Sequence, residues 1–181
     1  MKRLLVMCEG PNEKKIMDIL LENNCLKFTQ DDLLGLTIFH ARQISGSAQV
    51  RAELNQFPGE VDVYRIGDKQ NDKFEIPDDY KGKIDKVMKY CTKPEMEMLL
   101  IIAEGLEKEY EKVKSSMSPK EFAKANIRFR KKRYDNSTQF FEDYFDKNVD
   151  KLVNAIKEYR HIKGRSHTKN ELCLAELLVD E

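Results

Sequence analysis

Apolar residues recur along the first third of the chain with two different spacings. Residues 3–8 form a largely apolar run that ends at Glu9-Gly10-Pro11, which is typical of a buried strand followed by a turn. Residues 12–23 carry apolar side chains at helical spacing, with charged residues on the other face. Further strands are predicted at 36–41 and 61–66, and a further helix at 48–57. The order strand–helix–strand–helix–strand predicts a parallel sheet with right-handed crossovers.

Helical spacing dominates the second half of the chain. Two capping boxes, Thr92-Lys-Pro-Glu95 and Ser118-Pro-Lys-Glu121, indicate helix starts. After a polar loop, we expect helices at 83–90, from Thr92 to about Lys114, from Ser118 onward, at 137–160 and at 170–179. The predicted fold class is therefore α/β: a doubly wound, mostly parallel sheet over residues 1–115, with a helical C-terminal elaboration over residues 116–181 packed on that core.

Composition narrows the class of protein. The chain has 181 residues, which suits one domain with an extension, and 35% of them are charged with a net charge of zero. Global charge therefore gives no support for non-specific nucleic-acid binding, although charge can be segregated locally. The four cysteines are scattered without metal-binding spacing, which indicates reduced thiols in a cytoplasmic protein. No apolar run approaches the roughly 20 residues that span a bilayer, so we expect no membrane association.

Two acids fall where open α/β sheets bind their ligands. Glu9 follows the first predicted strand and Asp68 follows the third, and ligands sit at the carboxyl ends of such strands. Two converging carboxylates repel each other unless a cation lies between them. Mg²⁺ is the usual cation for oxygen ligands and suits phosphoryl chemistry. The competing interpretation is that each is an ordinary, solvated turn acid.

Three stretches of the chain resemble motifs of the Toprim superfamily of topoisomerases, primases and bacterial nucleases. The first is the apolar strand followed by Cys8-Glu9-Gly10-Pro11-Asn12-Glu13-Lys14. The second, Gly67-Asp68-Lys69-Gln70-Asn71-Asp72, matches the Asp-x-Asp motif at the end of the third strand. The third, Lys93-Pro94-Glu95-Met96-Glu97, is similar to a Pro-x-x-Glu region of stand-alone proteins of the defence type. The resemblance covers about residues 1–105.

The resemblance implies a role for each matching residue. Glu9 matches the acid that acts as general acid/base or metal ligand, Gly10 the turn glycine, and Asp68 the first acid of Asp-x-Asp. Gln70 replaces the second acid, and a neutral amide binds Mg²⁺ more weakly than a carboxylate. Asp72 or Glu97 is then the auxiliary metal-binding acid.

Two functions follow from this resemblance. The first is a Mg²⁺- or Mn²⁺-dependent, Toprim-like phosphodiester-acting protein, namely a small bacterial nuclease of phage defence or nucleic-acid maintenance. The alternative is a catalytically silent Toprim-like module that binds a partner protein or nucleic acid. Gln70 favours the alternative, while the intact Cys8-Glu9-Gly10-Pro11 motif favours the enzyme. A partner protein such as an ATPase encoded nearby also fits the resemblance.

One dense basic tract stands out in a chain of zero net charge. It contains Arg128, Arg130, Lys131, Lys132 and Arg133, with Phe129 inside it. Cations interleaved with an aromatic ring suit a phosphate backbone and an unstacked base. Lys14, one turn into the first helix, is near enough to the crevice to meet a phosphate. The competing interpretation of the tract is a solvated helix end or loop whose cations pair with acids of the chain.

Overall fold

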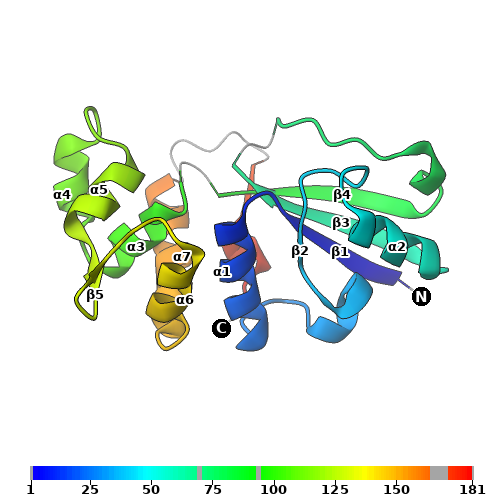
Figure 1. The fold of residues 1–181 in the computed structure, drawn as a ribbon, viewed down its shortest axis with the longest axis horizontal. Helices are drawn as coiled ribbons and strands as arrows, with labels where there is room; N and C mark the ends of the chain where they lie inside the picture. Colours follow the sequence, from blue (N-terminus) through cyan, green and yellow to red (C-terminus); the bar gives the residue numbers. More distant parts are fainter. Residues whose placement is uncertain (1, 69–70, 93–94, 164–170, 181) are drawn as a thin grey trace.

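The computed structural model describes residues 2–68, 71–92, 95–163 and 171–180 (Figure 1). Its centre is a five-stranded sheet in which every neighbouring pair of strands is parallel. The strands are β1 (Lys2–Cys8), β2 (Phe39–His40), β3 (Glu60–Gly67), β4 (Ile84–Cys91) and β7 (Leu172–Cys173), in the order β2-β1-β3-β4-β7. The predicted α/β class with a parallel sheet is confirmed.

Helices cover both faces of this sheet. Side chains of β1 alternate between the faces, because successive residues of a strand point to opposite sides. Val6 and Cys8 join the apolar cluster that includes helix α1 (Pro11–Glu22), while Leu5 and Met7 join the cluster that includes helix α2 (Ala48–Gln56). These two clusters are the core, and they hold the ends of the central strands in fixed positions.

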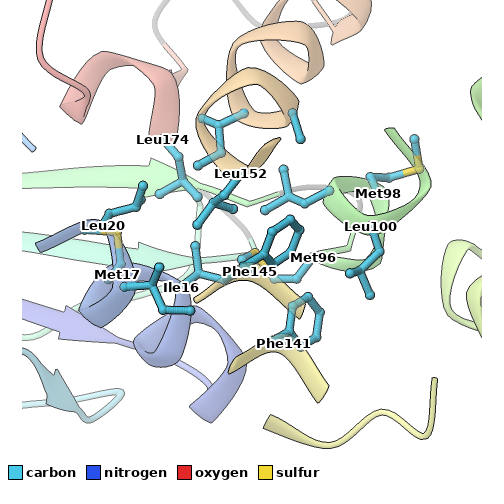
Figure 2. Close-up of a cluster of buried hydrophobic side chains, with 14 of the residues drawn as sticks. Ile16, Met17, Leu20, Met96, Met98, Leu100, Phe141, Phe145, Leu152 and Leu174 are labelled. Atoms are coloured by element: carbon cyan, nitrogen blue, oxygen red, sulfur yellow. The ribbon is translucent and has the colours of Figure 1, made fainter. Parts of the chain in front are cut away.

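A second group of helices lies to one side of the sheet (Figure 1). It comprises α3 (Glu97–Ala103), α4 (Glu107–Val113), α5 (Pro119–Asn126), α6 (Thr138–Phe145) and α7 (Val149–Lys163). Figure 2 shows how it joins the core: Ile16 and Leu20 of α1 lie in one cluster with Phe145 and Leu152. The helices therefore continue the hydrophobic core of the sheet. Within the described ranges, no helix is both long enough and apolar enough to cross a membrane.

The prediction of a helix at 83–90 was wrong, because this segment is the strand β4. It pairs with β3 along its length and with β7 at its end. Ile84, Val87 and Tyr90 are residue types that favour strands, but a short apolar pattern also fits a helix. Pairing with β3, and with β7 at the end of the strand, satisfies the backbone groups of this segment, and these contacts between distant parts of the chain favour a strand.

The prediction of a helix at 170–179 was also wrong. Residues Leu172–Cys173 add the strand β7 to the sheet, and a short 3₁₀ turn at Leu174–Leu177 follows. The segment 116–181 is therefore not purely helical, since it completes the edge of the sheet formed by the N-terminal segment. The predicted strand at 36–41 is likewise shortened to Phe39–His40.

The helices predicted at 12–23 and 48–57 are confirmed within one residue at each end as α1 and α2, whereas two other stretches were predicted as longer elements. The helix predicted from Thr92 to about Lys114 divides into α3 and α4 at Gly105, whose φ of +68° is a conformation that favours glycine. The stretch 137–160 divides into α6 and α7. The capping box at Ser118 and Glu121 is confirmed, with both reciprocal bonds present. The one proposed at Thr92 is wrong, because α3 begins at Glu97 without a side-chain cap.

Candidate functional site

Glu9 and Asp68 lie at the same edge of the sheet, as the strand order predicted. Their strands, β1 and β3, are adjacent and parallel, with Cys8 opposite Ile66. The backbone N–H of Glu9 donates to the carbonyl of Ile66 at 2.9 Å, so the ladder continues to the first residue of the turn. Both acids therefore leave the sheet at its carboxyl edge.

The side chain of Glu9 lies across the backbone of Gly67. A Cβ atom added to Gly67 would come within 2.3 Å of Glu9 Oε2 and 3.2 Å of Glu9 Cβ. A glycine is thus required for this close approach. Glu9 Oε2 is buried and has no hydrogen-bond partner in the described part of the chain.

Two arginines flank the Glu9 carboxylate; we call Arg42 and Arg65 the arginine pair. Arg42 Nε lies 3.6 Å from Oε1, and Arg65 Nη2 lies 3.6 Å from Oε2. The two differ greatly in environment, because the Arg42 side chain is 75% exposed and that of Arg65 only 4%. The same Nη2 atom lies 4.0 Å from Asp72 Oδ2. One guanidinium nitrogen is therefore shared by two acids that the sequence assigned to a metal.

Glu13 belongs to the site, although it was not predicted as a site residue. It lies in the first turn of α1 and folds back over Gly10, where a Cβ atom would come within 2.4 Å of its Oε2. Burial is the main cause that raises its pKa, and the charges of Asp68, Glu9 and Glu97 add to it. Three other carboxylates at this edge thus lie near enough to Glu13 for their charges to act on it. The signal was present in the sequence, since Glu13 lies three residues after the turn glycine.

Glu97 and Asp68 are held by hydroxyl donors. Glu97, at the start of α3, is buried and accepts a hydrogen bond of 2.7 Å from the hydroxyl of Tyr134, which is also buried. Burial, together with this bond to Glu97, raises the pKa of Tyr134, so the phenol stays protonated as the donor. Asp68 Oδ1 accepts from Thr92 Oγ1 at 3.3 Å. We call Glu13, Asp68 and Glu97 the acidic group.

The predicted metal ligands Glu9, Asp68, Asp72 and Glu97 do not form one closed set. Among the residues that the structure describes, no three His, Cys, Asp or Glu side chains are arranged to hold a metal ion. Asp72 faces Arg65, whereas Asp68 and Glu97 lie with Glu13. Carboxylate oxygens are the kind of ligand that a hydrated Mg²⁺ ion takes, since it uses only one or two protein carboxylates and keeps several waters. Gln70 lies outside the described residues.

The basic tract forms a hairpin, and not a helix end or an irregular loop. Strand β5 (Arg128–Phe129) pairs antiparallel with β6 (Lys132–Arg133). Arg130 and Lys131 make the turn with φ angles of 45° and 70°, which non-glycine residues rarely adopt. The cations are exposed, and Arg130 lies 5.1 Å from the ring centroid of Phe129. The tract therefore projects a cationic tip.

Lys14 lies on the surface of α1 and is engaged by a neighbour on the same helix. Its Nζ atom lies 2.6 Å from an oxygen of Asp18, one turn further on. A salt bridge between side chains four apart on one helix contributes little free energy, even though this pair is half-buried. The structure thus shows an alternative partner for Lys14 and leaves its contact with a phosphate as a prediction.

Comparison of the chain with family models, with curated proteins and with solved structures found no match. The functional argument therefore rests on the residues of this chain and their geometry.

Proposed function

We propose that the protein is a Mg²⁺- or Mn²⁺-dependent, Toprim-like phosphodiester-acting enzyme, a small nuclease of phage defence or nucleic-acid maintenance. The observation that supports this most directly is that Glu9 and Asp68 follow adjacent parallel strands at one edge of the sheet, where their charges and that of Glu97 act on Glu13. Carboxylates that repel each other at a ligand-binding edge are stabilised by a cation.

The proposed roles follow the surroundings of each acid. Glu9 is the general acid/base or first ligand, and Asp68, which is exposed, is the metal anchor. Glu97 is the auxiliary acid, because Tyr134 occupies Oε1 and orients the carboxylate. Asp72 is left out of this set, since its carboxylate faces Arg65. A bound divalent ion would neutralise negative charge on phosphate oxygens.

The hairpin β5–β6 supports a nucleic acid as the substrate. Its exposed cations suit phosphate contacts, and Phe129 offers a ring within the same hairpin. The hairpin also connects directly to the site, because the residue after β6 is Tyr134, the donor to Glu97. Binding of a phosphate backbone at the tip would therefore act on a segment that holds a site residue.

A specific observation also favours the second candidate function, the silent binding module. Arg65 already supplies a positive charge to Glu9 and Asp72, and Gln70 stands in place of an acid. Because the guanidinium of Arg65 partly balances the charge of these carboxylates, a metal ion would stabilise the site less. In that case the edge and the hairpin would bind nucleic acid or a partner protein without cleavage.

A nuclease assay separates the two functions. Wild type, Glu9→Gln and Asp68→Asn are assayed with Mg²⁺ and with Mn²⁺ on single-stranded DNA, double-stranded DNA and RNA. Glu22→Gln is the matched control, because it removes an exposed carboxylate from the other end of α1. We expect cleavage by wild type and by the control, and none by the two site variants. Absence of cleavage by a folded wild type on every substrate would leave the binding module as the function.

One further variant tests the resemblance to the Asp-x-Asp motif. Gln70→Asp restores the second acid of the Asp-x-Asp motif. If the site is a weakened Toprim centre, the variant binds Mn²⁺ more tightly than wild type, because a carboxylate adds a charged ligand. Unchanged Mn²⁺ affinity would argue against Asp68 and position 70 acting as one motif.

A further inference from the structure

Arg65 is the only arginine or lysine that the structure describes as fully buried, and it lies at the functional edge. It extends from β3 among residues packed against α2, and its guanidinium carbon is 5.9 Å from the ring centroid of Phe74. Its Nη2 atom lies between Glu9 Oε2 and Asp72 Oδ2, at 3.6 and 4.0 Å. Its Nε atom has no hydrogen-bond partner within the described ranges.

These distances differ from those of the ordinary ion pairs of the protein. Lys2 Nζ lies 2.6 Å from Asp85, and Lys14 Nζ lies 2.6 Å from Asp18. Such pairs close to hydrogen-bond distance, although solvent screens them and they contribute little. Arg65 is buried, where closing the pair would matter most, yet it stays too far from both acids for a hydrogen bond. It therefore resembles a cation placed between two ligands more than a partner in a salt bridge.

Stability alone does not explain this arrangement. Removing a charge from water is costly, and the attraction of a buried pair offsets that cost only when the hydrogen bonds are well formed. Within the described ranges the contacts are long and Nε has no partner, so a well-packed apolar residue would serve the fold at least as well. A buried charge with incomplete hydrogen bonding at a candidate site indicates a functional requirement.

We propose that Arg65 is a positioning residue that occupies the place a second divalent ion would take. It supplies fixed positive charge between Glu9 and Asp72, holds the Glu9 carboxylate against Gly67, and leaves the protein with a site for one divalent ion only. This inference rests on the proposed metal-dependent function. It also removes Asp72 from the metal ligands of the wild-type protein.

The test is the number and affinity of bound Mn²⁺ ions, measured by titration calorimetry and by the free-ion paramagnetic resonance signal. We expect wild type to bind one Mn²⁺ per chain. Arg65→Gln frees the two carboxylates that share the Nη2 atom, so it should bind a second ion, or bind the first at least about tenfold more tightly, because a repelling charge about 4 Å away is removed. Arg65→Lys keeps the charge and should bind one ion as wild type does.

Two further variants keep the inference testable if Arg65→Gln does not fold. Asp72→Asn alters a side chain that is 35% exposed, and it should change Mn²⁺ affinity by less than about threefold, since Asp72 is not a ligand while Arg65 is present. Arg51→Gln removes an arginine of α2 whose guanidinium donates a hydrogen bond to the carbonyl of Ser45, and it serves as the control, with one ion still bound.

The outcomes separate this inference from the proposed function. Two Mn²⁺ ions bound by wild type, or a loss of affinity above about tenfold in Asp72→Asn, would overturn the role of Arg65 alone, whereas no bound Mn²⁺ would overturn the metal-dependent function together with it. A folded Arg65→Gln that binds Mn²⁺ as wild type does would also overturn the role of Arg65. One ion bound by a wild type that cleaves nothing would instead overturn the nuclease and leave the role of Arg65 intact.

Discussion

Two groups of residues near Glu9 differ in how their negative charge is balanced. On one side, the arginine pair supplies positive charge from within the chain. On the other, the acidic group is held by neutral donors such as Tyr134 and Thr92, which orient carboxylates without cancelling their charge. The acidic edge is therefore not uniform: among the described residues, no lysine or arginine forms a salt bridge with the acidic group, so its charge is the part that an external cation could balance.

The largest effect on stability is expected where the internal cation is removed. Arg65→Gln leaves the Glu9 and Asp72 carboxylates without their buried partner, and we expect a loss of about 3 kcal/mol in the free energy of unfolding. Arg42→Gln, on the exposed side of the same carboxylate, should cost less than about 0.5 kcal/mol. Chemical denaturation of both variants measures the difference. Equal losses would show that the two arginines do not differ in the way that their burial indicates.

A smaller effect on stability, but a large one on function, is expected at the glycine beneath Glu9. In Gly67→Ala the new Cβ meets Glu9, and we expect a loss of about 1–2 kcal/mol together with loss of Mn²⁺ binding, because the carboxylate must move. Gly82→Ala is the control, since a Cβ there meets no atom within 4 Å. Denaturation and Mn²⁺ titration test both. Unchanged Mn²⁺ binding in Gly67→Ala would show that Glu9 is not a ligand of the metal.

The acidic side depends on the neutral donor Tyr134. Tyr134→Phe removes the hydrogen bond to buried Glu97 and should cost about 1–2 kcal/mol and weaken Mn²⁺ binding. Tyr80→Phe is the control: it is also buried, but its hydroxyl donates to Asn55, at a distance from the acidic group. The control should leave Mn²⁺ affinity unchanged. A similar Mn²⁺ affinity in both variants would reduce the Tyr134–Glu97 contact to a structural role.

A further prediction concerns pH and the unbalanced charge of Glu13. Its pKa is raised above the ordinary 4.5 in the folded protein, so the folded state holds this proton more tightly than the unfolded state. Stability from this group is therefore present below pH 4.5 and is lost as pH rises through the folded pKa. Glu13→Gln should stabilise the protein at pH 7 and make no difference at pH 4. Glu22→Gln is the control, and equal effects of Glu13→Gln at both pH values would contradict the convergence of charges.

The smallest effect on the fold is expected at the hairpin tip. Replacing Arg130, Lys131, Lys132 and Arg133 by Ala should leave stability nearly unchanged, because these side chains are exposed. It should weaken nucleic-acid binding at low salt and flatten the dependence of the binding constant on salt concentration. Lys108, Lys112, Lys124 and Lys147 replaced by Ala give a variant with the same change in charge. If the salt dependence of the binding constant is unchanged in the tip variant, the tract is a solvated surface hairpin that does not bind phosphates.

Local chemistry made one part of the site predictable. The apolar run of β1, the glycine-proline turn and the start of α1 lie within a few residues, so their order in the chain is also their order in space. The parallel arrangement then followed from alternating strands and helices, and it brought Glu9 and Asp68 to one edge. The hydrogen bonds of the Ser118 capping box were predictable for the same reason, because they join residues three apart.

The sequence by itself determined the α/β class, the position of Glu9 after the first strand and the cationic character of residues 128–133. Only the tertiary structure decided that 84–91 and 172–173 are strands, because their backbone groups are satisfied by neighbours distant in the chain. It also decided that Tyr134 holds Glu97, 37 positions away, and that Arg65 lies between Glu9 and Asp72. The physical reason is the same in each case. Periodicity reports which face a residue occupies, whereas the charge that a buried side chain meets depends on which elements pack together.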